Sequence, residues 1–144
     1  LGEAGLISGN YGAGLNTAAE ATVSGVEAVN MYLPAAKLTG STIAVGSPID
    51  GKNYFLLTKI GSTTGVGSFG ASTNPLTAAE SHSIDSKIDD GLPATGIVFA
   101  IDATGSLNIA TTWKTVSAVA GCVASSAYAV TQTTQSCSLR FRFQ

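Results

Sequence analysis

Hydrophobic and polar residues alternate most regularly near the end of the chain, in the segment SLRFRF. On an extended backbone Leu139, Phe141 and Phe143 fall on one side, and Arg140 and Arg142 fall on the other. Successive side chains of a strand point to opposite faces of the sheet, so this pattern predicts a half-buried β-strand.

Other strands are predicted earlier in the chain. Residues 41–46 and 52–60 predict two strands joined by a turn that contains Pro and Asp-Gly. Residues 96–102 predict a third strand and residues 107–116 a fourth. The Gly-, Ser- and Thr-rich residues 61–72 show no alternation and predict a loop. The short connections between these strands favour an antiparallel sheet.

The clearest helix signal covers residues 77–90. Thr77 is followed three residues later by Glu80, the spacing of a capping box at a helix N-terminus. Gly91 is positioned to end the helix. Three apolar side chains at a spacing of four residues are predicted to share the buried face: Ile84, Ile88 and Leu92.

The beginning of the chain carries weaker signals. Residues 1–9 predict the end of a helix that begins before the first residue, and residues 10–41 predict a long irregular connection. Residues 42–121 then contain the sheet with its short helix, and residues 122–144 contain the two cysteines and the last strand. The order predicts one α+β domain over residues 1–144, with a helix packed on the apolar face of an antiparallel sheet.

Composition narrows the class of protein. The chain has 144 residues, of which 44% are hydrophobic and only 11% are charged, against roughly 25% charged in ordinary soluble domains. A surface made mostly of uncharged polar residues is common in secreted and cell-surface proteins. The net charge of −2 and the seven scattered basic residues argue against nucleic-acid binding. No apolar run is long enough to span a bilayer within the sequence.

Cys122 and Cys137 are the only cysteines in the sequence. They are predicted to form one disulfide in an oxidising compartment, the alternative being two unpaired buried thiols. Two cysteines and one distant histidine do not make a four-ligand zinc site.

The segment between the cysteines carries no charge. It predicts a rigid, solvent-facing loop that contacts a neighbouring subunit or a foreign surface. An equally supported alternative is a disulfide that only stabilises the fold. The candidate contact residues are Ser125, Tyr128, Thr131 and Gln132.

His82, the only histidine, gives little support for catalysis. It lies one helical turn from Asp85, but no Gly-x-Ser-x-Gly motif supplies a nucleophile. We therefore expect His82 to be an exposed helix residue, and no catalytic residue or cofactor is predicted.

Three acidic residues, Asp85, Asp89 and Asp90, surround the predicted helix end. Calcium favours several carboxylates near a glycine turn, but this spacing is not an EF-hand loop. The favoured interpretation is structural: Asp89 or Asp90 accepts hydrogen bonds from the turn at residues 91–96. Asp85 is expected to pair with a basic residue, for example an arginine of the last strand. No metal site is predicted, and calcium binding is left open.

Aromatic side chains suggest an alternative function. Trp113, Tyr128 and Tyr54 could stack on a sugar ring, as in an extracellular adhesin or carbohydrate-binding module. A single tryptophan in a strand is more often part of the core, so this function is the second hypothesis.

Three stretches resemble the type IV pilin family, which includes the pseudopilins of type II secretion. They are EAGLISGNY (3–11), LPAAKLTGS (33–41) and IDSKIDDGLPATG (84–96). The resemblance implies an N-terminal helix, an antiparallel sheet and a C-terminal disulfide, and a structural role as a major pilin, minor pilin or pseudopilin.

The resemblance also implies partners and a location. Other pilin subunits would be the partners, in an extracellular filament of a Gram-negative bacterium, after anchoring in the inner membrane. Membrane contact would be made only by the hydrophobic first half of the N-terminal helix, which this sequence lacks. Motility, adhesion, DNA uptake and protein secretion all remain open as roles.

Overall fold

The computed structural model describes residues 23–24, 33–38, 40–47, 50–63, 68–108 and 119–143. The predicted helix end at residues 1–9, most of the connection at 10–41 and all of the predicted strand after residue 108 lie outside these ranges.

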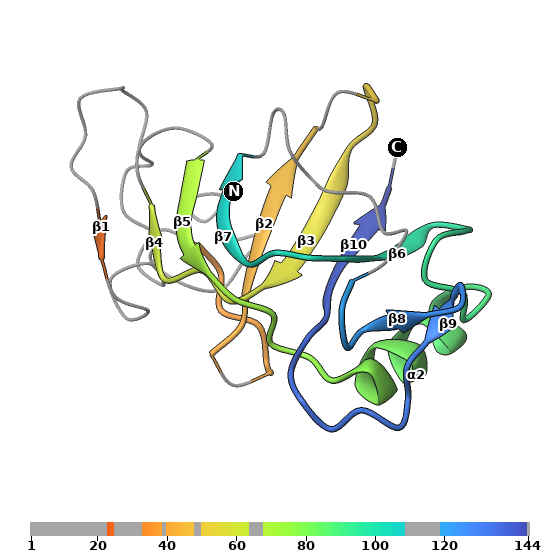
Figure 1. The fold of residues 1–144 in the computed structure, drawn as a ribbon. Helices are drawn as coiled ribbons and strands as arrows, with labels where there is room; N and C mark the ends of the chain where they lie inside the picture. The colour runs from red at the N-terminus through yellow and green to blue at the C-terminus, as the bar shows by residue number, and fades with distance from the viewer. Residues whose placement is uncertain are drawn as a thin grey trace.

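A four-stranded antiparallel sheet forms the centre of the molecule (Figure 1). Its spatial order is β2 (Thr42–Gly46), β3 (Tyr54–Thr58), β10 (Ser138–Arg142) and β6 (Val98–Ile101). All four strands were predicted. The last strand of the chain is inserted between β3 and β6, so its pairing joins segments that are far apart in sequence.

A second antiparallel sheet has the order β1, β4, β5 and β7. Its strands are Val23–Ser24, Ser62–Thr63, Ser68–Ser72 and Gly105–Asn108. The prediction of a loop over residues 61–72 is therefore wrong, because β4 and β5 lie within it. These residues lack alternation and gain their extended form from pairing with neighbouring strands.

Helix α2 (Ala78–Ile88) confirms the predicted helix and its capping box. The Thr77 side chain accepts a hydrogen bond from the backbone N–H of Glu80, and the Glu80 carboxylate accepts one from the Thr77 N–H. The predicted apolar face is wrong, however. Ile84 is half-buried, whereas Ile88 and Leu92 are 52% and 46% exposed.

The helix packs instead through small and polar residues. Its buried residues are Ala78, Ser81 and Asp85. Together with the hairpin of β8 (Val123–Ala124) and β9 (Ala127–Tyr128), it lies against one face of the central sheet (Figure 1). Within the described ranges, this confirms an α+β arrangement in which helix α2 packs on an antiparallel sheet.

The central sheet has an apolar cluster on each face. The cluster beneath α2 and the hairpin includes Leu57, Leu76, Val98 and Leu139. The cluster on the opposite face includes Leu56, Ile60, Phe69 and Ile101. The last strand was predicted to be buried on one face only, but both faces of the sheet are covered. Arg140 points to the face opposite Leu139 as expected, yet it is only 5% exposed.

Candidate functional site

The predicted disulfide joins Cys122 to Cys137. Both cysteines are fully buried, and the loop that they close is attached to the sheet region by backbone hydrogen bonds as well. Leu76 N–H donates to the Cys137 carbonyl at 3.0 Å, and Cys137 N–H donates to the Leu76 carbonyl at 2.9 Å. The bridge therefore closes the C-terminal loop on itself, and the backbone bonds at Cys137 attach that loop to the segment that enters helix α2.

The disulfide loop contains an ordered hairpin. Strands β8 and β9 are joined at Ser125 and Ser126, which have φ angles of 50° and 66°. Two consecutive residues with positive φ match the mirror-image turns that suit two-residue hairpins. Of the four candidate contact residues, Ser125, Thr131 and Gln132 are exposed.

The fourth candidate, Tyr128, is not a surface contact residue. Its side chain is 6% exposed and its hydroxyl donates a hydrogen bond of 2.8 Å to Asp85. Tyr54 is also buried. Neither ring is available to stack on a sugar, and Trp113 lies outside the described residues. The described part of the chain therefore lacks the predicted aromatic platform.

Asp85 is fully buried in helix α2, but its partner is not an arginine. Its carboxylate accepts hydrogen bonds from the Tyr128 hydroxyl and from the Gly91 N–H at 3.2 Å. The expected pairing with Arg140 or Arg142 is wrong. Burial raises the pKa of Asp85, although both hydrogen bonds act in the opposite direction. Burial, followed by the bond to Asp85, raises the pKa of Tyr128.

Asp89 and Asp90 hold the turn after the helix. Asp89 accepts hydrogen bonds from the N–H groups of Ile97 and Val98, and Asp90 accepts them from the Leu92 N–H and the Thr95 hydroxyl. The predicted hydrogen bonds from the turn at residues 91–96 are confirmed for Asp90, whereas the donors to Asp89 lie just beyond that turn. The bonds from Thr95 and then Leu92 lower the pKa of Asp90.

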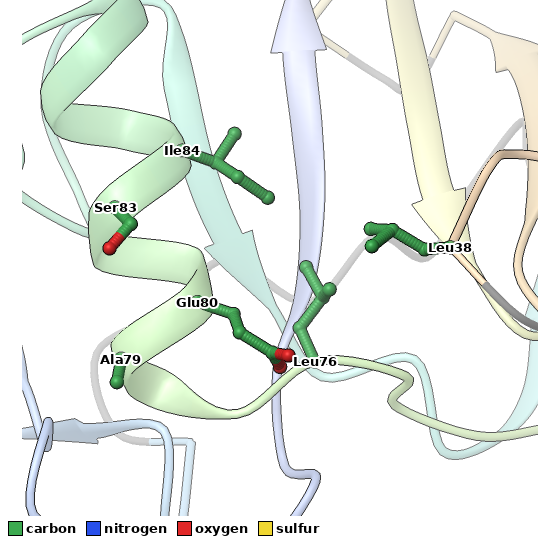
Figure 2. A pocket seen from close by; sticks show the side chains of 6 residues that line it. All are labelled: Leu38, Leu76, Ala79, Glu80, Ser83 and Ile84. Atoms are coloured by element: carbon green, nitrogen blue, oxygen red, sulfur yellow. The ribbon is translucent and has the colours of Figure 1, made fainter.

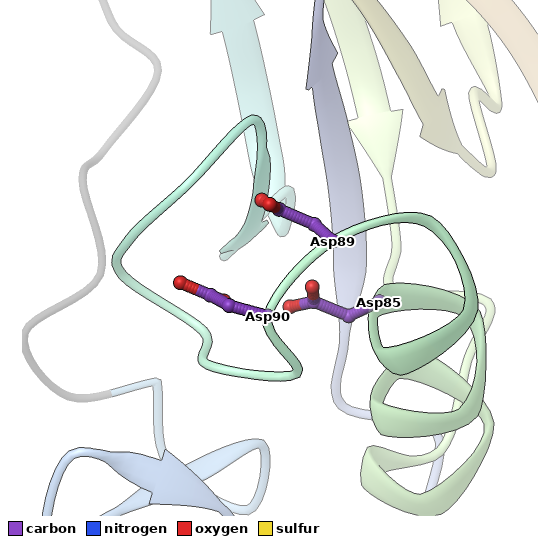
Figure 3. Close-up of side chains that lie close together, drawn as sticks. All are labelled: Asp85, Asp89 and Asp90. Carbon is purple, nitrogen blue, oxygen red and sulfur yellow. The ribbon is translucent and has the colours of Figure 1, made fainter.

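The three carboxylates converge at the end of α2, where an oxygen of each lies within 4.8 Å of the others (Figure 3). Each already accepts hydrogen bonds from the protein. The cluster is thus accounted for as a junction between helix α2, the turn at residues 91–97 and strand β6.

His82 is an exposed helix residue, as predicted. Its Nε2 lies 3.3 Å from the Ser86 hydroxyl, and its ring meets Tyr128 edge-on. Asp85 bonds to Tyr128 and Gly91 rather than to His82, so these residues do not form a Ser-His-Asp triad.

An apolar groove of about 340 Å³ runs beside helix α2 (Figure 2). Ile84 and Leu38 lie on its two sides, with Leu76 between them. The sequence indicated Ile84 as a buried residue but gave no reason to expect Leu38 opposite it, because that proximity arises from the fold.

The comparisons with known proteins give no family. No protein-family model, curated protein or solved structure matches this chain. Among the described residues, no helix is long and apolar enough to cross a membrane.

Proposed function

We propose that this chain is the globular head of a pilin-like filament subunit, from a type IV pilus or a type II secretion filament. Its role is structural rather than enzymatic. Its partners are other pilin subunits, and its location is an extracellular filament that is anchored in the inner membrane before assembly.

The observation that carries the proposal is the structure of the pilin-like segment at residues 84–96. Asp85 binds Tyr128 of the disulfide loop, and Asp89 binds the start of strand β6. Gly91 and Gly96 have φ angles of 73° and 71°, a conformation that glycine adopts without strain. The residues that produce the resemblance are thus the ones that connect helix, sheet and disulfide loop.

Exposed apolar side chains offer surface for subunit packing. Val45 and Phe55 face each other across β2 and β3, and Phe55 stacks on Phe143 with ring centroids 4.4 Å apart. Exposed apolar groups of this kind commonly mark interaction surfaces. Repeated contacts between two different surfaces of a subunit produce an open helical filament.

Surface composition and covalent chemistry support the location. The low content of charged residues and the buried disulfide suit a protein that functions outside the cytoplasm.

The test uses the complete natural gene, including any coding sequence upstream of residue 1, in a pilus-competent Gram-negative host. Filaments sheared from the cells should contain this chain by mass spectrometry and bind an antibody against it along their length in electron micrographs. A host that carries the same gene without its assembly ATPase serves as control. If both hosts hold the chain only as soluble monomer, the proposal is wrong.

A further inference from the structure

Arg140, on the inner strand β10, is a buried charged residue. Its side chain is 5% exposed, and its Nε has no hydrogen-bond partner. An isolated buried charge is unfavourable because the surrounding protein replaces water poorly, so buried guanidinium groups are usually paired with an acceptor.

Aromatic rings provide part of the compensation. The guanidinium carbon lies 4.6 Å from the Tyr54 ring centroid and 4.8 Å from that of Phe99. The two rings meet edge to face, 6.3 Å apart, and cover the guanidinium from two directions. Such contacts return less free energy than desolvation of the charge costs.

A carboxylate that acts on Arg140, that of Asp50, is hydrogen-bonded to other groups. Asp50 lies close enough to act on Arg140 through space, but it accepts hydrogen bonds from the Tyr54 hydroxyl at 2.6 Å and the Lys52 N–H at 3.1 Å. Neither of these bonds comes from Arg140, and its Nε stays without a partner among the described residues.

A second guanidinium lies beside the first. Arg142 is two residues along β10, on the same face of the strand, and its guanidinium carbon is 5.8 Å from the Phe99 ring. One of its nitrogens donates to the Gly96 carbonyl at 3.0 Å. The two guanidinium groups lie beside the same ring and repel one another as like charges.

We propose that Arg140 and Arg142 form a binding site for a carboxylate group. Aromatic rings lie over the guanidinium of Arg140 and its Nε is buried, so the in-plane N–H donors of its terminal nitrogens are the groups that can meet a ligand. Planar guanidinium donors match the two oxygens of a carboxylate. The site does not depend on the filament proposal, since a carboxylate can come from a small molecule or from an acidic side chain of another protein.

Binding is tested with malonate at pH 7, by calorimetry and thermal unfolding, against chloride at equal ionic strength. Malonate should raise the melting temperature saturably, with a dissociation constant on the order of 1 mM. Arg142→Gln should weaken binding about tenfold, as expected for loss of a charged hydrogen bond. Lys87→Gln removes the same charge from exposed helix surface and should leave binding unchanged.

Arg140→Gln tests the buried donor directly. Arg140→Lys, which keeps the charge but loses the planar donors, provides a second variant if the first does not fold. In the wild-type protein, malonate should shift the ¹⁵N–¹H signal of Arg140 Nε. Equal effects of malonate and chloride, equal losses in the Arg142 and Lys87 variants, or an unmoved Arg140 signal would each overturn the proposal.

Two further arms identify the class and source of the ligand. The first arm uses a blocked peptide that contains one glutamate. If the peptide binds as tightly as malonate, the site recognises acidic side chains; if malonate binds and the peptide does not, the site recognises small carboxylates. Phosphate binding more tightly than both ligands would overturn the carboxylate assignment. Glu20→Gln and Glu27→Gln test for a partner within this chain. If either variant lowers stability as much as Arg140→Gln, and the double variant loses no more than each single one, the partner belongs to this chain and the proposal of an external ligand is wrong.

Discussion

Tyr128 donates a hydrogen bond to Asp85 across 43 residues of sequence, with 2.8 Å between the phenol oxygen and the carboxylate. The tyrosine belongs to the disulfide loop and the aspartate to helix α2. A buried carboxylate must have donors, so this bond fixes the position of the loop on the helix as well as stabilising the charge.

Tyr128→Phe should lower the free energy of unfolding by about 1.5–3 kcal/mol, because it removes a hydrogen bond to a buried charged group. Thr95→Val is the matched control, since it also removes a hydroxyl that donates to a carboxylate, but at the exposed Asp90. Its effect should be much smaller because water replaces the lost donor. Urea unfolding measures both. Equal losses of unfolding free energy in the two variants would show that the buried Tyr128–Asp85 bond stabilises the fold no more than the exposed bond to Asp90.

Stability should also depend on the ionisation of Asp85. Burial raises the pKa of this carboxyl above its ordinary value of 3.8, so the folded protein binds the proton more tightly than the unfolded chain. The stability contributed by Asp85 is therefore complete below pH 3.8 and is lost as the pH rises through the folded pKa. Asp90 acts in the opposite direction, because its pKa is lowered.

Asp85→Asn separates the two contributions. Relative to this variant, the wild-type protein should lose stability as the pH rises from about 3.8 through the folded pKa of Asp85. Urea unfolding of both proteins between pH 3 and 7 measures the difference. A difference that stays constant, or that grows in favour of the wild type with rising pH, contradicts the proposed ionisation.

Removal of the disulfide by the double substitution Cys122→Ser and Cys137→Ser should cost about 3 kcal/mol for cysteines separated by 15 residues. The backbone bonds between Leu76 and Cys137 remain and still hold one end of the loop. The fold should therefore persist, with a lower melting temperature by calorimetry. Complete loss of folded protein at 25 °C would show that the bridge contributes far more than loop closure.

Local sequence signals predicted the parts of the fold that local interactions create. Thr77 and Glu80 lie within one helical turn, so the capping box could be recognised from their spacing. Strand β10 was recognisable from the alternation around Leu139 and Phe141.

The missed features depend on contacts between distant segments. β4 and β5 have glycine-rich sequences that become extended through pairing with β1 and β7. Asp85 was expected to find an arginine, because charge complementarity is visible in a sequence whereas the approach of Tyr128 is not. Arg140 was placed on a solvent-facing side because the alternation did not reveal the apolar cluster covering that face.

Gly96 provides the sharpest test of the acidic junction. A Cβ atom at this position would lie 1.7 Å from an oxygen of Asp89, and the φ angle is 71°. Gly96→Ala must therefore displace the carboxylate that binds Ile97 and Val98, in addition to straining the backbone. Gly51→Ala is the matched control, since its φ is 69° and no atom lies within 4 Å of the added group.

Gly51→Ala should cost about 1–2 kcal/mol from backbone strain alone, and Gly96→Ala should cost at least about 2 kcal/mol more from the lost charged hydrogen bonds. The excess should vanish when both glycine substitutions are compared in an Asp89→Ala background, because no carboxylate is then displaced. Urea unfolding of the four variants and their parents completes the cycle. Equal costs for the two substitutions in the wild-type background would mean that Asp89 does not hold the turn at residues 91–97.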